Sequence, residues 1–244
     1  APKAQNTTTR PAARSLPAIM SPVLLLLLAL ALPLTPANAQ PASAPAPAPA
    51  SPVMEDDVRC LRGVKAGLRD PNARLSSWTF TNTTPGAICS FSGVSCWNPQ
   101  ESRVLELDLS GFGLQGVVPS PLRYCRSTTT LDLSNNSLSG PIPPALCDWL
   151  PFLVDLNLSG KRLSGPIPSE LANCTFLNSL KLNGNFLSGQ IPVSLSRLVR
   201  LTSLDLSDNR LQGQIPPQLG AAFPEESFSG NPGLCGPPLS TSCN

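Results

Sequence analysis

The sequence predicts an α/β solenoid in which five stacked repeats place a parallel sheet on a concave face. Three observations predict it: strand-like leucine motifs recur at a near-constant spacing, a Gly/Pro-containing phrase follows each motif, and non-repeating segments flank the array. The strand-like motifs are LELDL (105–109), TTLDL (129–133), VDLNL (154–158), NSLKL (178–182) and TSLDL (202–206). Their central leucines lie 24, 25, 24 and 24 residues apart, and such a fixed period is typical of a repeat architecture.

Each repeat combines a strand, a turn and a return segment. The period is that of the leucine-rich repeat, in which the leucines of LxL point inward and the residue between them points outward. An Asn in the following turn can bond backbone groups of neighbouring coils, and it is present as Asn136, Asn185 and Asn209. Phe112 and Lys161 stand at this place in two repeats, and we expect Lys161 to swing outward and to weaken the Asn ladder locally.

The return segment carries a second repeated phrase. It reads LQGVVP (114–119), LSGPIP (138–143 and 163–168), LSGQIP (187–192) and LQGQIP (211–216). The Gly permits a sharp bend and the Pro fixes the chain on the convex side. The phrase resembles the plant-specific leucine-rich repeat, and the resemblance covers roughly residues 57–244.

The two ends of the array resemble caps, which a solenoid needs because its terminal coils expose core. The first cap begins with a helical spacing at Val58, Leu61 and Leu68 that Asp70-Pro71 would end, and Trp78 is expected to pack within it. Residues 228–243, FSGNPGLCGPPLSTSC, resemble the C-terminal cap of plant receptor-like kinases. The predicted divisions are 1–39, 40–54, a cap over 55–98, five repeats over 99–223, and a cap over 224–244.

The first 54 residues are expected to lie outside the fold. An apolar run of 12 residues (23–34) follows Arg10 and Arg14 and precedes Ala37-Asn38-Ala39. This order predicts a secretory signal peptide over 1–39. The Ala/Pro-rich residues 40–54 favour polyproline II and predict a disordered spacer. We therefore expect a secreted, apoplastic protein, or a plasma-membrane ectodomain if the gene continues past Asn244.

The chain has eight cysteines, and secretion permits disulfides. The pairs whose spacing fits local bridges in the caps are Cys89–Cys96 and Cys235–Cys243. Cys125 and Cys174 stand at the place of a buried repeat leucine, and we expect them to be small core residues and not bridges. The states of Cys60 and Cys147 are open, and a Cys125–Cys147 bridge between neighbouring coils is an alternative.

The composition excludes several classes of function. The chain has no histidine, which excludes His-based triads, His general bases and His-containing metal sites. From residue 40 onward, 14 basic residues face 15 acidic ones, a net charge of −1 that does not steer the chain to nucleic acid or to a membrane surface. We find no phosphate-binding loop, GxSxG motif or kinase signature. The prediction is a chain without enzymatic activity, cofactor or metal.

The concave face of the sheet is the predicted partner-binding surface, because it is the extended surface that a solenoid offers. The side chains expected to project there are Glu106, Asp108, Thr130, Asp132, Asp155, Asn157, Ser179, Lys181, Ser203 and Asp205. Five are acidic and one is basic, which would suit a basic partner edge. The LDLS aspartates also belong partly to the repeat consensus, so a plain solvated face is the competing interpretation.

Four sequons predict N-glycosylation of the mature chain. They are at Asn82, Asn135, Asn157 and Asn173. A glycan on Asn157 would obstruct part of the concave face, and Pro85, close after Asn82, would reduce the use of that site.

Three phrases narrow the resemblance to one group. They are DDVRCLRGVKAGL (56–68), CSFSGVSCWN (89–98) and ALCDWLPFLVDLNLS (145–159). They resemble the ectodomains of the BIR group, plant receptor-like pseudokinases that interact with SERK-type co-receptors. The resemblance implies binding of a SERK-type ectodomain through the concave face, restraint of immune or growth signalling, and a membrane helix and inactive kinase domain outside the given residues.

Two other functions stay open. One is a secreted inhibitor of microbial wall-degrading enzymes that resembles the polygalacturonase-inhibiting proteins. Those proteins carry more repeats and an adjacent cysteine pair in the cap, whereas this sequence has five repeats and no such pair. The other is a peptide-hormone receptor ectodomain, whose long groove generally needs many more repeats.

Overall fold

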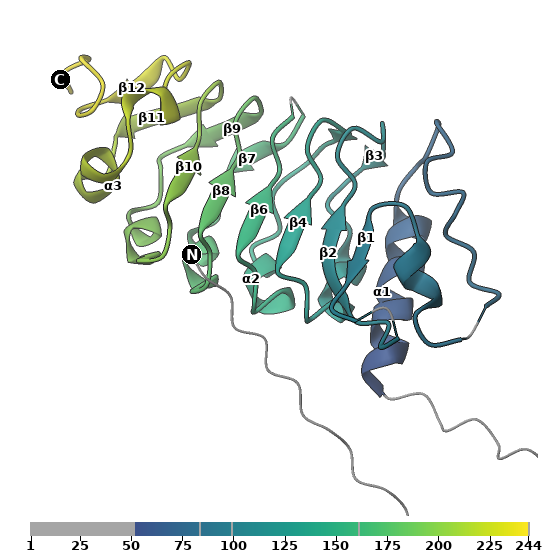
Figure 1. The fold of residues 1–244 in the computed structure, drawn as a ribbon. Coiled ribbons are helices and arrows are strands. Elements are labelled where there is room, and N and C mark those ends of the chain that lie inside the picture. The colour runs from purple at the N-terminus through teal and green to yellow at the C-terminus, as the bar shows by residue number, and fades with distance from the viewer. Residues whose placement is uncertain (1–51, 83, 99, 161, 244) are drawn as a thin grey trace, which may run out of the picture. The chain divides into compact units, whose positions relative to one another are not determined.

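The computed structural model describes residues 52–82, 84–98, 100–160 and 162–243. The predicted signal peptide, most of the predicted spacer and Lys161 lie outside these residues. In the described part, strands of successive repeats stand side by side between helix α1 at one end and helix α3 at the other (Figure 1). The predicted leucine-rich repeat solenoid is confirmed.

A six-stranded sheet runs along the solenoid in the order β1-β2-β4-β6-β8-β10. Its strands are β1 (Val94–Cys96), β2 (Val104–Asp108), β4 (Thr130–Asp132), β6 (Asp155–Asn157), β8 (Ser179–Lys181) and β10 (Ser203–Asp205). The strands β2 to β10 pair parallel, with the central leucines of the five motifs aligned across the sheet. Strand β1 pairs antiparallel with β2 and adds a cap strand that the LxL pattern does not mark.

The return phrases form short strands of their own, which the sequence analysis did not assign. They build a four-stranded parallel sheet, β12-β11-β9-β7, and a two-stranded sheet, β3-β5. These strands are β3 (Gln115–Gly116), β5 (Ser137–Leu138), β7 (Ser164–Pro166), β9 (Phe186–Gly189), β11 (Arg210–Gln214) and β12 (Gly233–Cys235). Gly165, with φ 84°, shows why the phrase needs glycine where the chain bends.

Short helices complete each coil, and the core lies inside. These elements are the 3-10 helices η1 (Ala87–Ser90), η2 (Ser120–Tyr124), η3 (Ser169–Asn173), η4 (Val193–Arg197) and η5 (Glu225–Ser227), with helices α2 (Leu146–Trp149) and α3 (Pro217–Ala222). Both leucines of the LxL motifs are at most 4% exposed in every repeat. Because burying one leucine contributes about 1.5–3 kcal/mol, the motif supplies much of the driving force for stacking.

A ladder of buried Asn side chains joins neighbouring coils. Asn185 represents it: Nδ2 donates to the carbonyl oxygens of Leu158 and Leu182, both at 2.9 Å, and Oδ1 accepts from the Leu163 amide at 3.0 Å. Asn136 and Asn209 make equivalent bonds. The ladder therefore satisfies backbone groups that stacking would otherwise bury without partners.

The ladder continues one coil beyond the predicted positions. Asn231 in the C-terminal cap accepts from the Leu211 amide at 3.0 Å and donates to the carbonyl oxygens of Leu206, Phe228 and Ser229, as the repeat asparagines do at equivalent positions. The sequence analysis missed Asn231 because no LxL motif precedes it. At the other end, Phe112 packs partly buried against the core, and its carbonyl oxygen accepts from Asn72 Nδ2 at 3.1 Å.

Helix α1 (Pro52–Gly67) forms the N-terminal cap and begins inside the segment assigned to the spacer. Leu61 and Val64 are fully buried on its inner side. Gly63 lies directly on Pro121 of η2, so close that a Cβ at this position would overlap the proline ring. Trp78 is 1% exposed and stacks on Phe91, with ring centroids 5.9 Å apart, as its predicted packing role requires.

The described cysteines form four disulfides. The two cap bridges that the spacing suggests, Cys89–Cys96 and Cys235–Cys243, are present.

The expectation that Cys125 and Cys174 are unbridged core residues is wrong. The structure joins Cys60 to Cys125 and Cys147 to Cys174, with Cα–Cα distances of 5.5 and 5.0 Å. The alternative Cys125–Cys147 bridge is likewise absent. The physical reason is that both leucine-like positions are buried, as expected, but each faces a cysteine of a neighbouring element at bridging distance.

Candidate functional site

The structure places all ten predicted face residues on one side of the six-stranded sheet. The register of the parallel strands aligns them in two rows. The first row holds Glu106, Thr130, Asp155, Ser179 and Ser203. The second row holds Asp108, Asp132, Asn157, Lys181 and Asp205. All ten are exposed or half-buried, and the leucine between the two rows of each strand is buried, so strand alternation defines the face.

The second row also holds the turns that end the strands. The carboxylates of Asp108, Asp132 and Asp205 each accept the amide N–H of the serine two residues later, at 2.8–3.1 Å. Asn157 does the same for Ser159 at 3.1 Å. This half of the acidic pattern therefore has a local structural role, as the consensus interpretation proposed. In the first row, the Glu106 and Asp155 carboxylates make no side-chain hydrogen bond within the described ranges. Their negative charges are therefore available to interact with a partner.

Of the four sequon asparagines, Asn157 makes the most side-chain hydrogen bonds within the described residues. Its Nδ2 donates to Asp132 Oδ2 at 2.8 Å, and its Oδ1 accepts from the hydroxyl of Ser159 at 2.8 Å. The half-buried side-chain amide of Asn157 on β6 is thus bonded to Asp132, its neighbour in the second row on β4. Asn82, Asn135 and Asn173 are exposed, which glycan attachment requires.

An exposed aromatic pair beside the sheet was missed by the sequence analysis. Phe152 is 54% exposed and Phe176 is 39% exposed, and their ring centroids lie 6.1 Å apart. Arg200 places its guanidinium carbon 5.1 Å from the Phe176 ring. Each of the three stands three residues before the first residue of its strand, β6, β8 or β10, so they follow one edge of the concave sheet. We call Phe152, Phe176 and Arg200 the aromatic edge.

The aromatic edge had a signal in the sequence. Each of its residues directly precedes a leucine that the repeat places toward the interior, as in Pro151-Phe152-Leu153. Phe152 and Phe176 each lie in a turn beside a leucine that fills the interior and are themselves exposed, and exposed aromatic residues are enriched at protein interfaces. The edge therefore extends the candidate binding surface beyond the ten predicted residues.

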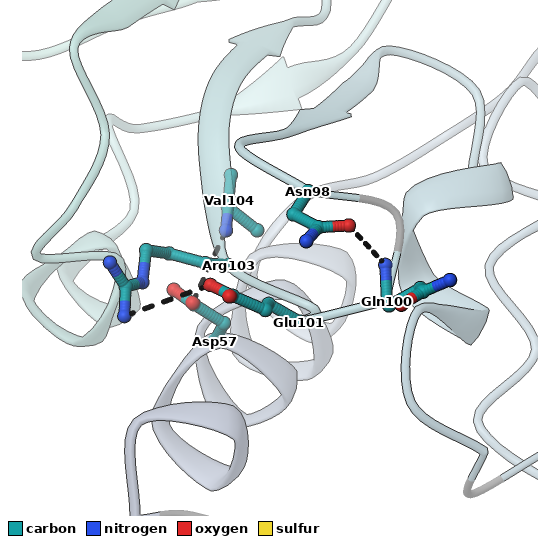
Figure 2. A network of polar contacts seen from close by, with 6 residues as sticks. All are labelled: Asp57, Asn98, Gln100, Glu101, Arg103 and Val104. Carbon is teal, nitrogen blue, oxygen red and sulfur yellow. Dashed lines mark hydrogen bonds and ion pairs between the residues drawn. The ribbon is translucent and has the colours of Figure 1, made fainter.

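A buried carboxyl lies at the joint between helix α1 and the first repeat. Asp57 of α1 is 2% exposed and accepts the amide N–H of Val104 at 3.2 Å (Figure 2). Burial raises the pKa of this carboxyl to about 7, although the Val104 hydrogen bond and the charge of Arg103 oppose the change and Asp56 adds to it. Arg103 itself meets Glu101 at 3.9 Å in an exposed ion pair.

The raised pKa predicts that the protein is more stable in acid than at neutral pH. Because the folded state holds a proton between about pH 4 and pH 7 that the unfolded chain releases, the free energy of unfolding falls as pH rises through this window. The expected loss at pH 8 relative to pH 4 is on the order of 4 kcal/mol, at about 1.4 kcal/mol per pKa unit. Asp57→Asn should flatten this slope in urea unfolding measured at several pH values.

Glu170→Gln is a suitable control, because it removes an exposed carboxylate on η3. It should keep the wild-type slope. A wild-type slope in Asp57→Asn would contradict the assignment of the pH dependence to this carboxyl.

Other kinds of site are not found in the described ranges. No cluster of three or more His, Cys, Asp or Glu side chains there could hold a metal ion. Among the described helices, none has the length and apolar character needed to cross a bilayer.

Comparison with known proteins gives concordant matches. The family model described as Leucine rich repeat N-terminal domain matches residues 54–97. The Leucine Rich Repeat model matches residues 127–149, 152–174, 176–198 and 200–222. The inactive LRR receptor-like serine/threonine-protein kinase BIR2 of Arabidopsis thaliana is 68% identical over 190 residues, which are 78% of this chain and 31% of BIR2. The chain thus spans about a third of the length of this curated relative.

Two solved structures match over nearly their whole length. The BIR2 ectodomain of Arabidopsis thaliana is 55% identical with a TM-score of 0.75, covering 77% of this chain and 98% of the ectodomain. A chain of the BIR3–SERK2 complex from the same organism is 51% identical with a TM-score of 0.74, covering 77% of this chain and 100% of its own length.

Proposed function

Because the chain belongs to the plant leucine-rich repeat receptor-like kinases of the BIR group, as an ectodomain, we propose that it binds a SERK-type co-receptor ectodomain and thereby restrains receptor signalling. The observation that carries the proposal is its 51% identity to a chain that was solved in the BIR3–SERK2 complex. The complex is a property of BIR3, and its transfer to this chain is the proposal.

The proposed contact surface is the first row of the concave face together with the aromatic edge. Glu106 and Asp155 provide charge that local turns do not use, and Phe152 and Phe176 provide exposed apolar area beside them. A buried aromatic centre with charged surroundings is the usual arrangement of a strong interface. The second row supports the strand ends and contributes less to affinity.

The proposal assigns no catalysis to this chain. BIR2 is an inactive kinase, and the matched part is the ectodomain. The proposed effect on signalling therefore comes from occupying the co-receptor.

Phe152→Ser combined with Phe176→Ser is expected to weaken binding at least about tenfold. The two rings are exposed in the free chain, so their removal should cost little stability, whereas desolvated aromatic residues often dominate affinity. The measurement is a calorimetric titration of secreted residues 40–244 with a purified SERK-type ectodomain.

Val117→Ser is the matched control, because Val117 is 54% exposed but follows β3, outside the concave sheet. It should bind like the wild type. Absence of wild-type binding up to high micromolar would contradict the proposed function and leave the fold untouched. Wild-type affinity in the double variant would contradict the proposed surface alone.

A further inference from the structure

A hollow of about 580 Å³ lies beside helix α1 in the N-terminal cap. Val58, Phe80 and Ile88 give it an apolar lining, and Arg59 and Arg62 are also among the residues that line it. Its volume falls within the ~300–1,000 Å³ typical of small-ligand sites. None of the concave-face residues lines it, so it is a feature apart from the proposed co-receptor surface.

A glycosylation sequon borders the same hollow. Asn82 and Thr84 both line it, and the sequence between them satisfies the Asn-x-Thr rule. Thr84 donates its amide N–H at 2.9 Å and its hydroxyl at 2.8 Å to Asn82 Oδ1. Over the described ranges, Asn82 Nδ2 donates to no acceptor. The side chain is therefore held through its oxygen, and the nitrogen that would carry a sugar is unengaged.

The aromatic ring of the hollow is fixed two residues before this asparagine. Phe80 meets Phe91 edge to face, with centroids 5.3 Å apart and an interplanar angle of 89°. The Arg62 guanidinium carbon lies 5.3 Å from the Phe80 ring centroid. The ring is thus part of a packed cluster and offers a preformed contact surface to whatever Asn82 carries.

We propose that Asn82 carries an N-linked glycan whose first N-acetylglucosamine occupies this hollow against Phe80. Pro85 lowers the fraction of chains that are modified, but it does not change where the sugar lies in the modified ones. The sugar comes from a lipid-pyrophosphate-linked oligosaccharide of the secretory pathway. The bond from sugar C1 to the pyrophosphate oxygen breaks, and the lipid pyrophosphate leaves with that electron pair. A bond from C1 to Asn82 Nδ2 forms, and the proton that Nδ2 loses passes to water. Nδ2 keeps its second proton, and Oδ1 keeps both hydrogen bonds from Thr84, so the observed side-chain arrangement accommodates the product.

The chemistry of the hollow matches a hexosamine. A pyranose ring has a C–H face that packs on the electron-rich face of an aromatic ring, and hydroxyl and acetamido oxygens around its rim. Arg62 borders the hollow, and its guanidinium lies 5.3 Å from the Phe80 ring centroid, where it can donate to those oxygens. Because the sugar is tethered at the border, its effective concentration is high and weak contacts suffice to seat it.

The test uses residues 40–244 secreted from insect cells, with each glycan trimmed enzymatically to one N-acetylglucosamine. A double-mutant cycle then compares the effect of losing the sugar on the melting temperature with and without Phe80. Peptide mass spectrometry is expected to find that sugar on Asn82. Asn82→Gln is expected to lower the melting temperature by about 3 °C in the wild type. In a Phe80→Leu background the same substitution should lower it by less than about 1 °C, because the sugar has lost its aromatic contact.

Asn82→Gln removes the Asn82–Thr84 hydrogen bonds both in the wild type and in the Phe80→Leu background. Their loss therefore cancels when the two changes in melting temperature are compared. Asn173→Gln, at an exposed sequon on η3 that does not border the hollow, is the control and should leave the melting temperature unchanged. An unmodified Asn82 peptide would overturn the proposal. Equal temperature shifts in the two backgrounds would overturn it as well, because the sugar would then act without Phe80.

Discussion

Replacing Cys60 and Cys125 together by serine is expected to lower the free energy of unfolding by about 4 kcal/mol. A disulfide stabilises mainly by restricting the unfolded chain, and the effect grows with the length of the closed loop. This bridge joins residues 65 positions apart, for which the chain-entropy relation gives about 4 kcal/mol. Both positions are fully buried, so the new hydroxyls find no water and add to the loss. Urea unfolding followed by circular dichroism measures the difference.

Cys89→Ser with Cys96→Ser is the matched comparison in the same cap. This bridge closes a loop of only 7 residues and should contribute about 2 kcal/mol. Equal losses in the two double variants would contradict the loop-length argument and point to local packing as the main contribution. Neither pair belongs to the concave face, so the affinity of the folded fraction for a co-receptor should be unchanged.

The repeat period was sufficient to predict the parallel strands of the concave sheet, but neither the strands of the return phrases nor how the caps join the repeats. The LxL motifs specify β2, β4, β6, β8 and β10 because strand alternation and stacking follow from one buried leucine row. Strand β1 has no such motif, and its antiparallel pairing with β2 depends on the path of the cap chain.

The two long-range disulfides could likewise not be predicted from the sequence, because they depend on how distant elements pack. A spacing of 7 or 8 residues predicts the two cap bridges, whereas separations of 65 and 27 carry no signal. Cys125 and Cys174 were correctly expected to be buried, but burial alone does not reveal which neighbour each faces.

The candidate site was partly predictable for related reasons. Alternation within each strand placed Glu106, Asp155 and the other face residues correctly, because it depends only on the neighbouring leucines. The contact between Phe152 and Phe176 required the register of adjacent coils. The raised pKa of Asp57 required knowing that the fold buries this carboxyl of α1 beside Val104, the first residue of β2, which no local pattern encodes.

Asn209→Leu is expected to lower the free energy of unfolding by at least about 3 kcal/mol. Asn209 is 5% exposed. Its Nδ2 donates to the carbonyl oxygens of Leu182 and Leu206 at 3.0 and 3.1 Å, and its Oδ1 accepts from the Leu187 amide at 3.0 Å. Leucine is of similar size, so the loss comes from buried backbone groups left without partners, each costing about 1–3 kcal/mol. Equilibrium urea unfolding of the purified variant measures it.

Asn178→Leu is the control that tests whether the loss of stability depends on burial of the asparagine or follows from the loss of any asparagine hydrogen bonds. Asn178 Nδ2 donates to the Arg200 carbonyl oxygen at 3.1 Å, and its Oδ1 accepts from the Thr202 hydroxyl at 3.0 Å, but these groups are exposed and water can replace the lost partners. The expected loss is below about 1 kcal/mol. Similar losses in the two variants would mean that water also reaches the ladder positions, and that stacking of the coils depends on the leucines without the asparagines.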